Sequence, residues 1–78
     1  MTDQEYLMHT PFITNRDYLD VNTGIFIPKG LWPIVLDLRT EPVLNHFSVY
    51  VEREMAYCDV HGKRCSIPRN NLTRIHKQ

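Results

Sequence analysis

The sequence predicts a mainly β domain, built as a small antiparallel barrel or a strongly bent sheet with one or two short helices. Five prolines and few alanines among 78 residues disfavour long helices. Runs of β-branched and aromatic residues are bounded by Pro and Gly, which is typical of strands and turns. One small core fits this length, so residues 1–78 are expected to form a single domain, with a short helical turn or arm over residues 1–9 and a β core over residues 10–76.

The first half of the chain is expected to alternate short strands with turns. Thr10-Pro11 ends the N-terminal helical turn, because proline disfavours the helical conformation of the residue before it. Tyr18-Leu19 is a candidate short strand. Residues 24–27 form a strand that stops at the turn of residues 28–30, and the β pattern resumes over residues 34–38. Two strands joined by a short Pro/Gly loop are expected to pair with each other as a hairpin.

Two further elements are expected between residues 40 and 51. Thr40 as an N-cap and Pro42 in the first turn favour a brief helix over residues 40–46. Residues 47–51 alternate apolar and polar side chains, which is the period of a half-buried strand.

The most specific local prediction is a hairpin over residues 55–67 with a two-residue turn at His61-Gly62. Glycine adopts positive φ freely, and histidine tolerates it better than most residues. The opposed pairs are then Val60 with Lys63, Asp59 with Arg64, Cys58 with Cys65, and Tyr57 with Ser66. The same register collects one buried face: Ala56, Cys58, Val60, Cys65 and Ile67. Pro68 closes the second strand, and Leu72 and Ile75 indicate a last short strand.

Both cysteines and two histidines form a series that superficially resembles a zinc site: Cys58, His61, Cys65 and His76. The spacing matches no common zinc module, and the predicted hairpin sends His61 to the turn while both thiols share one face. A disulfide is disfavoured because Cys58 and Cys65 would form a hydrogen-bonded pair, whose wide Cα separation suits a relaxed bridge less well. We expect two buried reduced thiols, no metal and no cofactor.

The sequence indicates a binding module and not an enzyme. Nucleophilic catalysis needs a Cys or Ser beside a base that a third group orients. The four histidines are scattered and the three glycines stand alone, so neither a catalytic set nor a phosphate-binding loop is assigned.

The formal net charge is zero, but the charges are unevenly distributed. Residues 1–60 contain nine acidic and four basic residues, and only basic residues follow: Lys63, Arg64, Arg69, Arg74 and Lys77. This basic end supports an alternative function, a small-barrel protein that binds nucleic acid, with Trp32, Tyr50 and Tyr57 available for stacking. The pI of about 6.9 lies below the usual range of such domains.

Protein or peptide binding is the preferred function. An extended peptide can add a strand to an exposed sheet edge, and we expect the ligand to lie near Phe47, Val49 and Tyr57. A homodimer formed through such an edge is a further alternative. The acidic N-terminal sequence and the short apolar runs predict a cytoplasmic protein that does not enter a membrane. The small size also suits a phage- or plasmid-encoded inhibitor of a host protein.

Four sequence anchors occur in a recognisable order: Thr10-Pro11, Gly24-Ile25-Phe26-Ile27-Pro28, Ile34-Val35-Leu36-Asp37-Leu38, and Ser66-Ile67-Pro68 followed by Leu72 and Ile75. From Thr10 onward this order resembles the substrate-binding domain of the stringent starvation protein B (SspB) family, adaptors that deliver tagged proteins to the ClpXP protease. The resemblance implies an Sm-like, partly open barrel with a peptide-binding groove. Residues 1–9 stand in place of the family's long dimerisation helix, His61-Gly62 replaces its glycine pair, and its docking tail has no counterpart after Gln78. Tethering to ClpX is therefore not expected.

Overall fold

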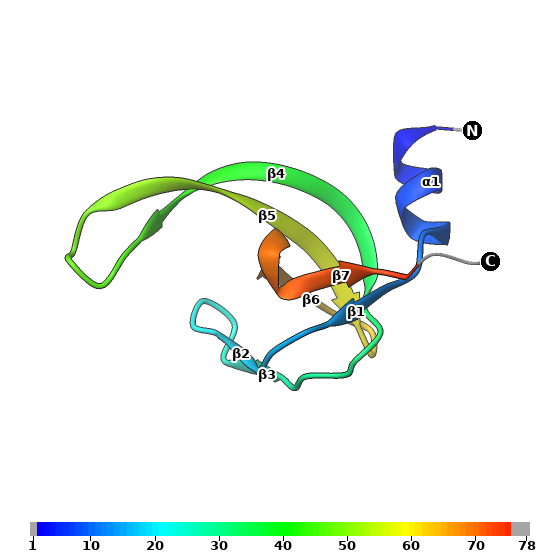
Figure 1. The fold of residues 1–78 in the computed structure, drawn as a ribbon, viewed down its shortest axis with the longest axis horizontal. Coiled ribbons are helices and arrows are strands. Elements are labelled where there is room, and N and C mark those ends of the chain that lie inside the picture. The colour runs from blue at the N-terminus through cyan, green and yellow to red at the C-terminus, as the bar shows by residue number, and fades with distance from the viewer. Residues whose placement is uncertain (1, 76–78) are drawn as a thin grey trace.

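The computed structural model describes residues 2–75, which form short helical and strand elements around a bent three-stranded sheet (Figure 1). In chain order these are α1 (Asp3–His9), β1 (Phe12–Thr14), β2 (Tyr18–Asp20), β3 (Ile25–Ile27), β4 (Ile34–Leu44), β5 (Tyr50–Val60), β6 (Lys63–Pro68), the 3-10 turn η1 (Arg69–Asn71) and β7 (Leu72–Arg74). Strand β1 pairs with β7, β2 with β3, and β5 lies between β4 and β6, all antiparallel. The mainly β, antiparallel prediction is confirmed, although the strands of residues 2–75 do not close into a barrel.

Helix α1 is capped at both ends by threonine. The Thr2 hydroxyl accepts a hydrogen bond from the Glu5 amide at 3.2 Å, which satisfies one of the free donors of the first turn. At the other end, Thr10 donates from its hydroxyl to the Tyr6 carbonyl at 2.7 Å. Pro11 follows and cannot continue the helix. The predicted helical turn before residue 10 is therefore confirmed for the described residues. Within residues 2–75, neither helical segment has the length and apolar character that crossing a bilayer requires.

The hairpin of β5 and β6 has the predicted register. His61 and Gly62 have φ of 52° and 82°, the positive values that a two-residue primed turn requires. The turn is closed by Asp59, whose carboxylate accepts from the Gly62 amide at 2.8 Å and lies 3.5 Å from Arg64. The observed pairs are Val60 with Lys63, Asp59 with Arg64, Cys58 with Cys65, and Tyr57 with Ser66. The face predicted to be buried is buried along its whole length.

The core joins the three sheets. It contains side chains from β1, β3, β4, β5, β6 and β7: Phe12, Ile27, Val35, Ala56, Cys58, Val60, Cys65, Ile67 and Leu72. Leu7 of α1 packs against this cluster from the helix side. The predicted last strand after Pro68 is also present, since β7 pairs with β1 and the Ile75 amide donates to the Pro11 carbonyl at 3.0 Å.

The predicted hairpin between residues 24–27 and 34–38 is wrong. Strand β3 pairs with β2, and Asp20 holds the turn between them by accepting from the Gly24 amide through its carbonyl at 2.7 Å and from Asn22 through its carboxylate at 3.0 Å. The loop after β3 is bound instead to Thr14. The Thr14 hydroxyl accepts from the Leu31 amide at 2.8 Å and donates to the Pro28 carbonyl at 2.7 Å. The Pro/Gly loop therefore carries β4 away from β3.

The predicted helix over residues 40–46 is also wrong, because β4 continues through them to Leu44. Pro42 lies opposite Glu52 in the pairing of β4 with β5. A register shift between Val35 and Asp37 marks a bulge, which bends a strand locally. Beyond it, residues 39–54 project from the body as a curved two-stranded ribbon, which we call the arm (Figure 1). The molecule is consequently 41 Å long and 24 Å in the other two dimensions.

The strand predicted from residue 47 begins only at Tyr50. Residues 45–49 form the turn at the end of the arm, where the Asn45 side chain accepts from the amides of Phe47 at 2.9 Å and Val49 at 3.1 Å. Ser48 has a φ of 60°. An Asn side chain that bonds to nearby amides stabilises a turn in place of an extended strand.

Replacing a core isoleucine should destabilise the protein more than the same change on the surface. Ile67 is fully buried, whereas Ile34 is 47% exposed. We expect Ile67→Val to lower the free energy of unfolding by about 0.5–1.5 kcal/mol. The matched change Ile34→Val should stay within about 0.5 kcal/mol of the wild type. Urea unfolding of both variants measures the difference, and equal effects would contradict the assigned core.

Candidate functional site

Strand β5 is paired on both sides along only part of its length. Its pairing with β4 runs from Tyr50 to Asp59, but its pairing with β6 begins at Met55, opposite Pro68. After Pro68 the chain turns into η1, which leaves the sheet but stays beside β5, where Asn70 lines a hollow of about 300 Å³ together with Glu52 and Glu54. Among the described residues, the side of β5 between Tyr50 and Glu54 therefore has no neighbouring strand. We call residues 50–54 on this side the open edge.

The backbone amide and carbonyl groups of Tyr50, Glu52 and Glu54 point toward the open edge. Residues of an antiparallel strand alternate between bonding to one neighbour and pointing to the other side. The two-residue turn at His61-Gly62 makes Val60 bond toward β6, and every second residue back along β5 has the same direction.

The hydrogen bonds at the turn of the arm assign the same outward direction to Tyr50, Glu52 and Glu54. The Asn45 amide donates to the Val49 carbonyl at 3.0 Å and closes the arm, so the next pair, Leu44 with Tyr50, does not bond across the two strands. The next pair of the same kind is Pro42 with Glu52, and Pro42 has no N–H with which to bond Glu52. Proline is tolerated at this position because its missing donor would have pointed away from β5.

A groove lies between the arm and the β2–β3 hairpin. Its volume is about 360 Å³, and its lining includes Val21 from the hairpin and Val43, Leu44 and Tyr50 from the arm. The hairpin is held against the body because the second carboxylate oxygen of Asp20 accepts from the Ser66 amide at 3.1 Å. Tyr50 belongs to both the groove and the open edge, so the two features are continuous.

The groove also contains a tyrosine that stays neutral at physiological pH. Burial raises the pKa of Tyr18 above 10.0, and the nearby Asp20 carboxylate raises it further. The groove lining is mixed, because the carboxylates of Asp20 and Glu41 lie in it beside the apolar side chains.

Phe47 and Val49, two residues predicted to contact a ligand, lie in the turn at the end of the arm and are largely exposed. The third, Tyr57, does not join them, because it lies on the part of β5 that β6 covers. Roughly 25 Å of extended strand separates Tyr57 from Val49, at about 3.3 Å per residue. The three residues therefore do not form one site, and residues 50–54 of the open edge were missed. The early end of β6 at Pro68 was the sequence signal that could have indicated them.

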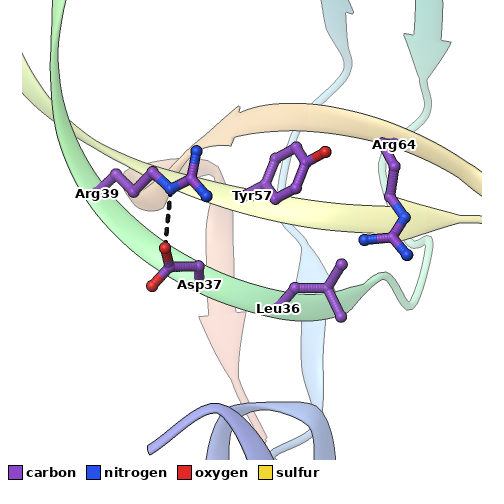
Figure 2. A pocket seen from close by; sticks show the side chains of 5 residues that line it. All are labelled: Leu36, Asp37, Arg39, Tyr57 and Arg64. Atoms are coloured by element: carbon purple, nitrogen blue, oxygen red, sulfur yellow. Dashed lines mark hydrogen bonds and ion pairs between the residues drawn. The ribbon is translucent and has the colours of Figure 1, made fainter.

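Tyr57 lines a separate hollow of about 330 Å³ on the body of the sheet (Figure 2). The Arg39 guanidinium lies 4.9 Å from the Tyr57 ring centroid and its Nε donates to Asp37 at 2.8 Å. This hydrogen bond lowers the pKa of the Asp37 carboxyl and raises that of Arg39. Arg64, at the other end of the hollow, lies beside Asp59. Each arginine of this hollow thus has a carboxylate partner.

The basic residues proposed for nucleic-acid binding are spread over three elements. Arg69 lies over the Phe12 ring at 5.0 Å and donates to the Leu72 carbonyl at 2.8 Å. Arg74 donates to the Tyr6 hydroxyl at 2.6 Å. Lys63 is exposed beside the β5–β6 turn, and Lys77 lies outside the described residues. The arginines are therefore already engaged by neighbouring groups.

The two cysteines are free, buried and directly opposite each other, as predicted. Burial raises the pKa of Cys58 from 9.0 to about 12 and that of Cys65 to about 11. His61 is exposed in the turn, and His76, the last member of the zinc-like series, lies outside the described residues. Over residues 2–75, no group of three or more His, Cys, Asp or Glu side chains lies close enough to hold a metal ion. Thiols with raised pKa values are poor nucleophiles near neutral pH.

No family model matches the chain, and no curated protein or solved structure matches it significantly. The function is therefore inferred from the structure, and the open edge with the adjoining groove is the feature that the inference uses.

The stability of the protein should decrease above pH 9. The thiols ionise near 9 when the chain is unfolded but only near 11–12 when it is folded, so the unfolded state releases protons first. Their contribution to stability is complete below pH 9 and is lost as the pH rises toward 12. We expect a loss of about 2–3 kcal/mol from the two thiols together between pH 8 and pH 10, measured by urea unfolding. The Cys58→Ala variant should show a shallower decrease, and an unchanged slope in that variant would rule out Cys58 as a cause.

Proposed function

We propose that this protein is a non-catalytic peptide-binding module that takes an extended segment of another protein as an added strand along the open edge. The observation that carries the proposal is the outward direction of the backbone groups of Tyr50, Glu52 and Glu54. Unpaired strand edges are templates for pairing with another chain. Backbone hydrogen bonds then supply affinity, and side-chain pockets beside the edge supply selectivity.

Exposed apolar side chains next to the edge support this function. Leu44, Phe47, Val49 and Tyr50 are all more than half exposed at the end of the arm. Scattered apolar residues are normal on protein surfaces, but a contiguous group marks a contact surface. In this proposal, the ligand backbone pairs with β5 while its side chains contact Tyr50 and the groove beside it.

The biological role that fits best is that of an adaptor or an inhibitor of another protein. The order of the SspB-like anchors supports an adaptor-like role and an open, Sm-like arrangement of the strands. Nucleic-acid binding is the competing function, but Arg64, Arg69 and Arg74 would have to exchange their present partners for phosphates. Peptide binding requires no such exchange at the open edge.

A proline in the open edge should block peptide binding without unfolding the arm. Peptides that bind the wild type are first selected from a displayed library of short random peptides. Glu52→Pro removes one outward N–H that β4 does not use, so the fold should persist and the affinity for the selected peptide should fall about tenfold or more. Fluorescence anisotropy measures the affinity, and circular dichroism checks the fold.

Glu52→Ala is the matched control, because it removes the same side chain and keeps the N–H. It should retain most of the affinity. Equal affinity in the two variants, or a library that yields no binder to the wild type, would contradict strand addition at this edge.

A further inference from the structure

The open edge has a defined charge pattern. Glu52 and Glu54 are two residues apart on β5 and therefore share one face of the arm, whereas Arg53 between them lies on the other face. By the same alternation Glu52 and Glu54 lie on the face of β5 that carries the buried Ala56 and Cys58, whereas Arg53 lies on the face that carries Tyr57. The face with the two glutamates is therefore acidic at this position.

Neither glutamate forms an ion pair within the described part of the chain, although the adjacent Arg53 lines the same hollow as both of them. Both side chains are exposed, and the two ion pairs formed within residues 2–75 join other residues, Arg39 with Asp37 and Arg64 with Asp59. Their cross-strand neighbours on β4 are uncharged: Pro42 lies opposite Glu52, and Thr40 lies opposite Glu54. A strand added on the open side is the neighbour that can bring cations to these positions.

The same face becomes apolar toward the end of the arm. Tyr50 is 71% exposed and lies opposite Leu44, which is also exposed. This face of the open edge thus presents the aromatic Tyr50 first, followed by the acidic Glu52 and Glu54. A ligand strand meets one apolar position and two acidic ones at alternate residues.

A second copy of the chain does not complement this pattern. Two copies of the open edge that pair antiparallel are related by a two-fold axis. If Tyr50, Glu52 and Glu54 of both copies take part, this axis passes beside Glu52. This register places Glu52 opposite Glu52 and Tyr50 opposite Glu54. Like charges directly opposite each other are destabilising, so the pattern disfavours a homodimer through this edge.

We propose that the open edge selects an extended peptide with Lys or Arg at two alternate positions, opposite Glu52 and Glu54, and an apolar or aromatic residue at the next alternate position, opposite Tyr50. The proposal rests on the peptide-binding function proposed above and specifies the chemistry of the ligand. Opposite charges at facing positions stabilise a strand pair, and they do so more strongly when the added strand displaces water from both.

The test uses two synthetic probe peptides in both chain directions, since the ligand can add parallel or antiparallel to β5. The basic probe has the sequence Lys-Thr-Lys-Thr-Tyr, and the acidic probe is the same peptide with Glu in place of each Lys. At low salt we expect the wild type to bind the basic probe roughly tenfold more tightly than the acidic one in fluorescence anisotropy titrations. The preference should shrink as salt is added, because the charges are solvent-exposed.

Charge reversal at the edge should invert the preference. The double variant Glu52→Lys/Glu54→Lys should bind the acidic probe more tightly than the basic one. Glu5→Lys, an equivalent substitution on the exposed surface of α1, should keep the preference of the wild type.

The outcomes separate this proposal from the one on which it rests. Equal binding of the two probes, or a preference that survives in the double variant, overturns the charge selectivity. If the library-selected peptide still distinguishes Glu52→Pro from Glu52→Ala, peptide binding at the edge stands even then. If neither probe binds and that selection also yields nothing, both proposals fail. A concentration-dependent dimer in light scattering that Glu52→Pro abolishes would identify a second copy as the occupant and overturn the proposed ligand.

Discussion

The alternation of backbone directions along β5 is the constraint on which both the sheet and the candidate site depend. The turn at His61-Gly62 fixes which residues of β5 bond toward β6, and the arm turn at Asn45 fixes which bond toward β4. Both turns give the same assignment. Strand β6 ends at Pro68, opposite Met55, whereas β5 already begins at Tyr50. The outward backbone groups of residues 50–54 therefore have no strand to bond to. The open edge is thus a consequence of unequal strand lengths, and it needs no special local geometry.

An unpaired edge is normally a liability, and its charges explain how this one remains compatible with a monomer. Charged side chains on an edge oppose pairing with an identical strand. Under the proposed ligand selectivity, Glu52 and Glu54 do this and also define the partner, since what repels a second copy attracts a basic peptide. The stability of the fold depends on other residues. The side chains of Thr14 and Asp20 accept hydrogen bonds from the Leu31 and Ser66 amides, and these bonds fasten the loop after β3 and the β2–β3 hairpin to the body.

The sequence predicted the parts of the fold that depend on neighbouring residues and missed those that depend on distant ones. The hairpin at His61-Gly62 was predictable because turn residues, charge pair and apolar alternation all indicated one register. The helix expected at residues 40–46 failed because Thr40 and Pro42 also fit a strand once β5 lies alongside. Phe47 and Val49 proved to be near the candidate site, but Tyr57 did not. Pro68 marks the end of β6 in the sequence, but the open edge also requires β4 to continue beside β5 past that point, and alternation within β5 alone does not show this.

Amide hydrogen exchange of the free protein, followed by NMR, tests the central claim most directly. We predict slow exchange at Val51, Arg53 and Met55, whose amides bond to β4, and fast exchange at Tyr50, Glu52 and Glu54. Cys58, bonded to β6 in the core, provides the internal reference for full protection. Uniform protection from residue 50 to residue 55, or protection of the even-numbered residues alone, would contradict the assigned register and with it the open edge.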